Sequence, residues 1–193
     1  MGKVTAQMSM SVDGFIAGPD PSQDNPLGTN GERLHDWIFN NPGQENTLAT
    51  GLKKTTGAAI IGYNMYYEAI PYWDGTGPLG PDIPTFVLTE KGKESQDAPK
   101  VFTFVTDGIE SALQQARAAA GDKDVWIGGG AHAIQQYLKA GLLNELHVHL
   151  VPILLGGGTS LFGSLGEYIE LEKVSVTDDK DVTHLLYRFK TRG

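Results

Sequence analysis

The sequence predicts an α/β fold with a mostly parallel central sheet, an antiparallel C-terminal edge and helices on both faces. Between residues 58 and 138, short apolar stretches typical of strands alternate with helical patterns, which is the order that parallel strands require. After Gly141 the pattern changes, because apolar and polar residues alternate from 146 to 151 and two more strands follow without an intervening helix. We expect one domain over residues 1–193, since this length suits one hydrophobic core.

Composition narrows the classes of function. The net charge of −8 and the lack of a basic cluster argue against a nucleic-acid or anionic-membrane partner. The chain has no cysteine, so disulfides and thiolate metal sites are excluded, and the zinc signature of nucleobase deaminases is missing. No segment approaches the ~18 consecutive apolar residues of a membrane span, and we expect a cytoplasmic protein.

The N-terminal quarter predicts a strand, a turn, a long loop and a helix. Residues 3–10 alternate polar and apolar side chains, and the turn dipeptide Asp13-Gly14 follows them. Residues 15–31 are rich in Gly, Pro, Asp, Ser and Asn, which cannot form a core but can cover one, so we interpret this loop as a lid. Apolar residues at helical spacing then predict a helix over 32–39.

The middle of the chain predicts strands and helices in alternation. A helix over 45–55, capped by Gly57, precedes a buried strand over 58–61. Gly62 leads from that strand into another helix, where a second anion site is geometrically possible. Three further elements follow: strands over 85–88 and 101–105, and a helix over 109–120 with an N-cap from Thr106-Asp107.

Three consecutive glycines join a predicted strand to a predicted helix over residues 124–138. Glycines allow a backbone to approach a ligand closely, and the free N–H groups at the start of a helix attract anions such as phosphate. Glycine turns between strand and helix also occur for steric reasons alone, so this stretch by itself leaves both interpretations open. Gly141 is the expected end of the helix.

The C-terminal third predicts antiparallel strands. A glycine-containing excursion over 152–162 precedes strands over 170–177 and 183–190. His147 and His149 lie two residues apart on one strand and could bind a metal, but no third ligand has matching spacing. We therefore expect no metal and a structural or hydrogen-bonding role for both histidines.

Five segments in this order resemble the reductase domain of bacterial riboflavin biosynthesis, in the dihydrofolate reductase superfamily. They are residues 11–17, 62–68, 86–89, 126–130 and 144–158. The resemblance covers most of the chain and is closest to stand-alone reductase-like proteins. It implies a dihydrofolate reductase-like fold and a nicotinamide cofactor, NADPH with NADH not excluded, across the carboxyl ends of the parallel strands.

The resemblance also implies which residues hold the cofactor. The diphosphate would lie on Gly128, Gly129, Gly130 and Ala131. Gly62, Asn64 and Met65 would contribute from the other side, Thr89 at the adenosine end, and Ser9, Ile16 and Ala17 near the nicotinamide.

One position departs from the family. Tyr63 stands where a basic residue usually contacts the 2′-phosphate of NADPH, which puts the preference for NADPH in doubt. Lys91 or Lys93 could supply the missing charge.

Catalysis of hydride transfer to a C=N bond needs an acid, and a carboxyl group in an apolar wall can stay protonated for this purpose. Asp36, beside Trp37, is the candidate by analogy with dihydrofolate reductase, and its alternative role is that of a solvated helix residue. Asp13 is the second candidate, and its alternative role is that of a turn residue. Phe15, Trp37 and Trp73 are candidate substrate contacts, while tryptophans more often lie in the core.

The resemblance implies a nicotinamide-dependent reductase of a pyrimidine- or pterin-like small molecule, similar to 5-amino-6-(5-phosphoribosylamino)uracil reductase. Dihydrofolate reduction is one alternative, and a non-catalytic nucleotide-binding protein is another. The strand over 146–151 and its antiparallel neighbours resemble the surface through which riboflavin reductase domains dimerise, so we expect a homodimer.

Overall fold

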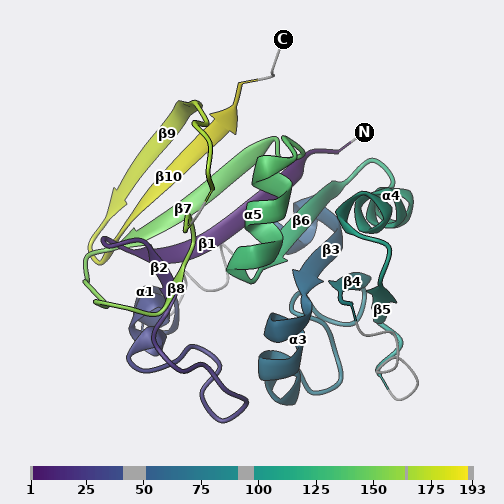
Figure 1. The fold of residues 1–193 in the computed structure, drawn as a ribbon, viewed down its shortest axis with the longest axis horizontal. Coiled ribbons are helices and arrows are strands. Elements are labelled where there is room, and N and C mark those ends of the chain that lie inside the picture. The colour runs from purple at the N-terminus through teal and green to yellow at the C-terminus, as the bar shows by residue number, and fades with distance from the viewer. Residues whose placement is uncertain (1, 41–50, 91–97, 164, 191–193) are drawn as a thin grey trace.

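Up to residue 139 the chain contains both strands and helices, and the described elements after it are all strands (Figure 1). This computed structural model describes residues 2–40, 51–90, 98–163 and 165–190. The elements before residue 90 are β1 (Val4–Ser11), β2 (Phe15–Ala17), η1 (Gly31–His35), α1 (Asp36–Phe39), β3 (Thr56–Gly62), α3 (Tyr63–Ala69), η2 (Ile70–Tyr72) and β4 (Thr85–Leu88). Those after it are β5 (Phe102–Val105), α4 (Ile109–Ala120), β6 (Asp124–Gly129), α5 (Ala131–Lys139), β7 (Glu145–Val151), β8 (Thr159–Ser160), β9 (Leu171–Asp179) and β10 (Val182–Phe189).

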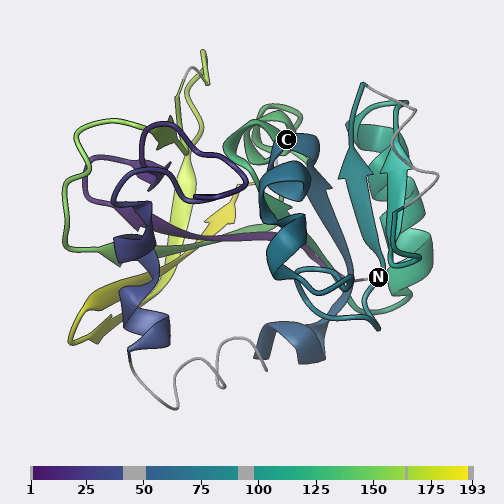
Figure 2. The same cartoon turned by 90° about the horizontal axis from the view of Figure 1, so that it is seen from below.

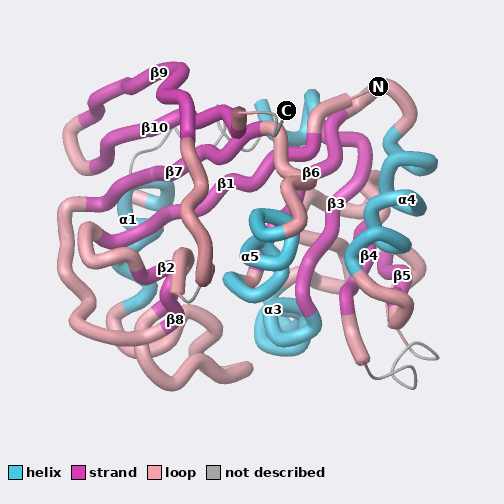
Figure 3. Tube along the Cα trace, turned by 45° about the horizontal axis from the view of Figure 1, so that its top comes forward, coloured by secondary structure: helices cyan, strands magenta, loops and turns pink. Residues whose placement is uncertain are grey.

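One eight-stranded sheet has the order β5-β4-β3-β6-β1-β7-β10-β9, and β2 pairs separately with β8. The pairs from β5 to β7 are all parallel, whereas β10 pairs antiparallel with both β7 and β9. This arrangement confirms the predicted mostly parallel sheet with an antiparallel C-terminal edge, and Figure 3 shows the hairpin of β9 and β10 beyond β7.

Helices cover both faces because residues of alternate parity along each strand point to opposite sides. Ala6 and Val148 pack on the side of α5, in the large core that also contains Ile134. On the other side, buried Trp37 of α1 donates a hydrogen bond from Nε1 to the Oγ atom of Ser9, 3.2 Å away. Figure 2 shows α1 and α5 on opposite sides of the sheet.

Several predicted boundaries need correction. Gly57 is not a helix cap but part of β3, where an added Cβ would lie 2.6 Å from the backbone oxygen of Ala120. The N-cap of α4 is Gly108, with φ +93 and no side-chain capping bond, and not Thr106-Asp107. The helix expected over 32–39 is divided into a 3₁₀ segment and a short α-helix.

The helix expected over 45–55 lies partly outside the described residues, which begin again at residue 51 and are helical to residue 55. The strand assigned to a dimer surface, β7, is interior, because β1 and β10 pair with its two edges. The edge strands of the sheet are β5 and β9, and β9 belongs to the antiparallel side named in the prediction, so a dimer formed by edge pairing on that side would use β9. No helix in the described ranges is long and apolar enough to cross a membrane.

Candidate functional site

A cleft opens where two central parallel strands separate. β1 pairs with β6 only from Val4 to Ala6, while its pairing with β7 continues to Ser11. Beyond Ala6 the two strands diverge, and the space between them continues into a cavity of about 990 Å³. Gln7 and Ser9 of β1 line it, together with residues at the carboxyl ends of β3, β4, β5 and β6. Open α/β sheets bind their ligands at this position.

The three glycines of the Gly128-Gly129-Gly130 turn differ in what a side chain would meet at each position. A Cβ at Gly128 would lie 2.7 Å from the ring of Trp126, so side-chain packing excludes any larger residue. Gly129 has φ +120, which L-residues rarely adopt, and a cis peptide bond joins it to Gly130. A Cβ at Gly130 would have no heavy atom within 4 Å, and Gly130 lines the cleft. Among the three, Gly130 is the one at which the protein leaves room for a side chain, and it lines the cleft.

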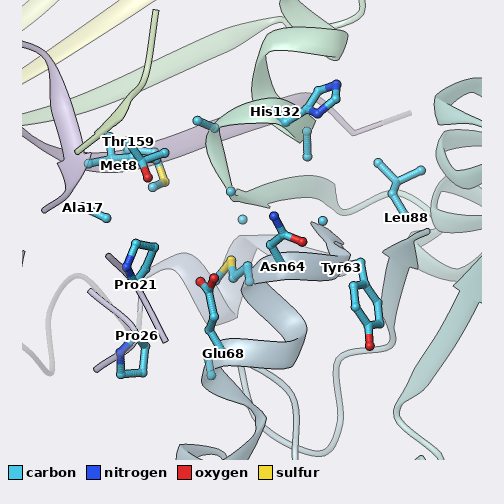
Figure 4. Close-up of a pocket in the computed structure, with 18 of the residues that line it drawn as sticks. Met8, Ala17, Pro21, Pro26, Tyr63, Asn64, Glu68, Leu88, His132 and Thr159 are labelled. Atoms are coloured by element: carbon cyan, nitrogen blue, oxygen red, sulfur yellow. The ribbon is translucent and has the colours of Figure 1, made fainter. Parts of the chain in front are cut away.

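The first turn of α5 adds backbone donors to this wall. Gly130 is the N-cap, with an extended backbone and no side-chain capping bond, and Ala131, His132 and Ala133 follow it along the cleft (Figure 4). The first N–H groups of a helix have no partner within the helix, and the helix dipole makes this end positive. The wall can therefore accept a phosphate or carboxylate.

The opposite wall is α3, whose residues Tyr63, Asn64, Met65 and Glu68 line the cleft (Figure 4). The ring of Tyr63 stacks on that of Tyr67, with ring centroids 6.1 Å apart. Burial raises the pKa of the Glu68 carboxyl above its ordinary value.

The loop between β2 and η1 lies along the mouth of the cleft, as predicted for a lid. Pro21 and Pro26 line the cavity and face Glu68 in Figure 4. Two hydrogen bonds tie the loop to the opposite wall: Gln23 Nε2 donates to the Tyr67 backbone oxygen at 2.9 Å, and the Tyr72 hydroxyl group is 3.3 Å from the Asp24 backbone oxygen. These bonds hold the loop across the opening. Its role as a lid stays a prediction.

The charges of the cleft are acidic or neutral. Among the lining residues in the described ranges, Glu68 and Glu90 are acidic, three are histidines and none is Lys or Arg. Lys91 and Lys93, which follow β4, lie outside the described residues. None of the described residues that line the cleft therefore carries the positive charge that the family usually has at the position of Tyr63.

Residues 2–185 match the RibD C-terminal domain family. The chain belongs to this family. It is also similar to the protein YwjB of Bacillus subtilis, with 24% identity over 169 residues that cover 84% of each chain. A riboflavin biosynthesis protein RibD of Corynebacterium ammoniagenes is 26% identical over 82% of this chain, which spans 45% of that protein.

Solved structures agree with this assignment. A protein of Shewanella sp. PV-4, assigned provisionally to riboflavin biosynthesis, superposes with a TM-score of 0.72 and 25% identity, over 97% of this chain and 99% of that one. A dihydrofolate reductase of Enterococcus faecalis superposes with a TM-score of 0.62 and 18% identity, over 97% and 96% of the two chains. The fold is thus dihydrofolate reductase-like, as the sequence predicted.

The residues predicted to hold a cofactor come together in the cleft, with one exception. Gly129 does not line it, because it turns towards Met65 and Met8. The lining residues among those predicted are Ser9, Ile16, Ala17, Gly62, Asn64, Met65, Thr89, Gly128, Gly130 and Ala131. They come from separate strands and helices, and the carboxyl edge of the sheet places them together.

Neither predicted acid lines the cleft. Asp36 forms an ion pair with Arg33, with 3.1 Å between Oδ2 and Nε, and its side chain is 39% exposed. Asp13 accepts hydrogen bonds from the Ser11 hydroxyl group at 2.6 Å and from the backbone N–H groups of Leu155 and Gly156. These bonds lower the pKa of Asp13, the Ser11 bond contributing most. Asp13 therefore joins the turn after β1 to the loop after β7, and its catalytic role stays an untested prediction, as does that of Asp36.

The three predicted substrate contacts also lie outside the cleft lining. Trp37 is 1% exposed in the core beneath β1 and β7, and Trp73 stacks on Phe102 at a ring-centroid distance of 6.0 Å. Phe15 belongs to β2, which pairs with β8. For both tryptophans the core interpretation describes the observed packing.

Sequence reasoning missed Glu68 and His35 as residues of the cleft, and assigned no ligand-binding role to His149. Glu68 lies four residues after Asn64 on α3, so helical spacing could have identified it. His35 and His149 carried no such signal, because they reach the cleft from elements far apart in the sequence. The described part of the chain contains no group of three or more His, Asp or Glu residues placed to hold a metal ion.

Proposed function

We propose that this protein is a nicotinamide-nucleotide-dependent reductase of a small heterocyclic molecule. The observation that carries the proposal is the glycine turn at the start of α5, where Gly130 presents bare backbone to a cleft at the carboxyl ends of parallel strands. Membership of the RibD C-terminal domain family supports it, since the RibD relatives are named for riboflavin biosynthesis.

The residues present fit such a cofactor. Gly130 and the N–H groups at the start of α5 would hold the diphosphate, Thr89 would lie towards the adenosine, and Ser9 and Ala17 would lie towards the nicotinamide. The cofactor would supply a hydride. NADPH is the proposed form, because the dihydrofolate reductase with this fold was solved with NADP(H). NADH remains the alternative, because Tyr63 replaces the usual basic residue.

The proposed substrate is a pyrimidine- or pterin-like ring, as in reduction of 5-amino-6-(5-phosphoribosylamino)uracil or of dihydrofolate. The start of α5 would already hold the cofactor diphosphate, and no Lys or Arg of the described ranges lines the walls to pair with a second phosphate on the substrate. The cleft therefore favours an unphosphorylated heterocycle over the phosphorylated one.

A non-catalytic nucleotide-binding protein is the second candidate. The specific observation in its favour is that Asp36 and Asp13, the acids expected from the sequence, both lie outside the cleft lining. In that case the cofactor would bind without turnover.

One experiment separates these candidates. Purified protein is titrated with NADPH and with NADH, and oxidation of each is then followed with the phosphorylated ribosylaminouracil, its dephosphorylated form and dihydrofolate. Turnover of any of the three supports the reductase, and tight binding without turnover supports the second candidate. Failure to bind either nucleotide would refute both.

A further inference from the structure

A buried histidine without a partner on one ring nitrogen borders the nicotinamide end of the cleft. His149 of β7 lines the cavity together with Ser9 and Ile16, and its residue is only 5% exposed. Its Nε2 atom has less than 1 Å² of accessible surface and makes no hydrogen bond within the described part of the chain. Leaving a buried polar atom unpaired costs about 1–3 kcal/mol, so such an atom beside a ligand cleft indicates a ligand partner.

The other ring nitrogen of His149 is engaged with a second histidine. Its Nδ1 atom lies 2.7 Å from Nδ1 of His184, which is directly opposite on β10. Trp37 packs against both histidine rings, and the centroid of each imidazole ring lies 5.0 Å from the centroid of the Trp37 ring. The indole group is itself held by the hydrogen bond to Ser9. The pairing of β7 with β10 and the contact with Trp37 therefore hold the two rings in place. His184 is partly exposed, so one end of the pair is accessible to solvent.

The surroundings keep His149 neutral. Burial, followed by the nearby His184, His147 and His35, lowers the pKa of His149 to about 3. Burial also lowers the pKa of His184, although Asp179 of β9 acts in the opposite direction. Two neutral imidazoles that share an Nδ1–Nδ1 hydrogen bond hold one proton between them, so the tautomer of one ring determines that of the other.

We propose that His149 and His184 form a relay that delivers a solvent proton to the substrate. The inference rests on the proposed reductase function, because reduction of a C=N or C=O bond adds a hydride to carbon and a proton to the heteroatom. His149 supplies that proton from Nε2, which becomes accessible to the substrate by a small movement of the ring on binding, and no carboxylate is needed at this position.

The step balances in protons and charge. Before transfer, His184 donates from Nδ1 to Nδ1 of His149, which leaves Nε2–H of His149 as the donor towards the cleft. The Nε2–H bond breaks as the proton passes to the substrate nitrogen or oxygen that gains negative charge. His149 takes the Nδ1 proton of His184, and His184 takes a proton at its own Nε2 from an acid in the solvent, either hydronium or protonated buffer, which loses one positive charge. Both rings remain neutral with their tautomers exchanged. After product release, a water molecule that enters the cleft gives a proton to Nε2 of His149, His149 returns its Nδ1 proton to His184, and His184 releases its Nε2 proton to solvent. The hydroxide formed in the cleft and the released proton combine in the solvent, and both tautomers are restored.

The relay also defines the part of the substrate at this end of the cleft. A neutral N–H group pairs with a ring nitrogen or a carbonyl oxygen, and it does not neutralise a phosphate. The ligand class is therefore a heterocycle that presents a C=N or C=O acceptor next to the reduced carbon.

The test uses His149→Gln and His184→Gln, with His147→Gln as the matched control, because His147 lies on the same strand but does not line the cleft. Glutamine at 184 can still donate a hydrogen bond to His149 but cannot pass a proton. For the best substrate of the three-compound panel, we expect kcat to fall roughly 100-fold in His149→Gln and at least about tenfold in His184→Gln, with KM and nucleotide affinity within about threefold of wild type. The control should keep wild-type turnover.

Nitrogen NMR of the five histidines adds a readout that does not depend on turnover. We expect His149 to stay neutral between about pH 5 and pH 8 and to carry its proton on Nε2. Adding the substrate to the complex with oxidised nucleotide should shift both His149 and His184, whereas oxidised nucleotide alone should not.

Three results would overturn the relay alone: unchanged kcat in His149→Gln, ordinary titration of His149 near its usual pKa, or a response of His149 to the nucleotide alone. A hundredfold loss in Asp36→Asn without loss in His149→Gln would assign the proton to Asp36 instead. Absence of nucleotide binding or of hydride transfer would refute the proposed function itself, and the relay with it.

Discussion

Replacing Gly130 with valine adds a branched side chain to a residue that lines the cleft. The backbone of Gly130, at φ −70 and ψ −170, is one that valine adopts readily, and the new Cβ meets no heavy atom within 4 Å. Gly129 is a worse position for this test, because φ +120 would strain any substituent whether or not a ligand binds there. Valine is a poorer N-cap than glycine, which predicts a loss of about 1 kcal/mol in folding free energy.

The expected effect on nucleotide affinity is larger. If the diphosphate contacts the backbone at Gly130, the valine carbons occupy its space, and we expect a roughly thirtyfold weaker Kd, about 2 kcal/mol. A nucleotide at 100 times the wild-type Kd stabilises the wild type by about 2.7 kcal/mol, and would stabilise the variant by only about 0.9 kcal/mol. The rise in Tm on adding nucleotide should therefore fall from roughly 5–11 °C to roughly 2–4 °C.

The assay is a calorimetric titration with NADPH and NADH, together with thermal melts with and without nucleotide. Gly130→Ala should give an intermediate loss. Gly51→Val is the control, because Gly51 is exposed, has open space at its Cβ and does not line the cleft. Unchanged affinity in a folded Gly130→Val protein would refute the placement of the diphosphate.

Three further predictions address cofactor choice, pH dependence and assembly. Tyr63→Arg should raise the preference for NADPH over NADH by roughly tenfold, about 1.4 kcal/mol, as measured by the ratio of the two Kd values; a wild type that already prefers NADPH a thousandfold would contradict this. Because burial raises the pKa of Glu68, its charge destabilises the fold above the unfolded-state pKa. Glu68→Gln should therefore melt higher than wild type at pH 7, and this advantage should vanish as the pH falls below the ordinary glutamate pKa; an advantage that persists in acid would exclude ionisation as the cause. Light scattering should give twice the chain mass of 20.8 kDa for the wild type. Val176→Lys, at an exposed position on the edge strand β9, should give the mass of a single chain. A monomeric wild type would contradict the homodimer.

The sequence by itself determined the order and type of most elements, because hydrophobic periodicity is local. The apolar stretch over 58–61 became β3, the amphipathic stretch over 109–120 became α4 with the predicted limits, and the C-terminal alternation became an antiparallel hairpin. The glycine turn before α5 was also recognisable, since a strand, three glycines and a helical pattern are adjacent in the chain. Resemblance to a family then added the cofactor positions, nearly all of which the fold gathers in the cleft.

Only the tertiary structure decided which side chains face the ligand space. Asp36, Trp37 and His35 are neighbours on one short helical stretch, yet the first pairs with Arg33, the second is buried and the third lines the cleft. Likewise, no sequence pattern joins His149 to His184, because they meet through the register of β7 with β10. The physical reason is that periodicity specifies which residues share a face of one element, whereas a site depends on how faces of different elements are oriented against one another.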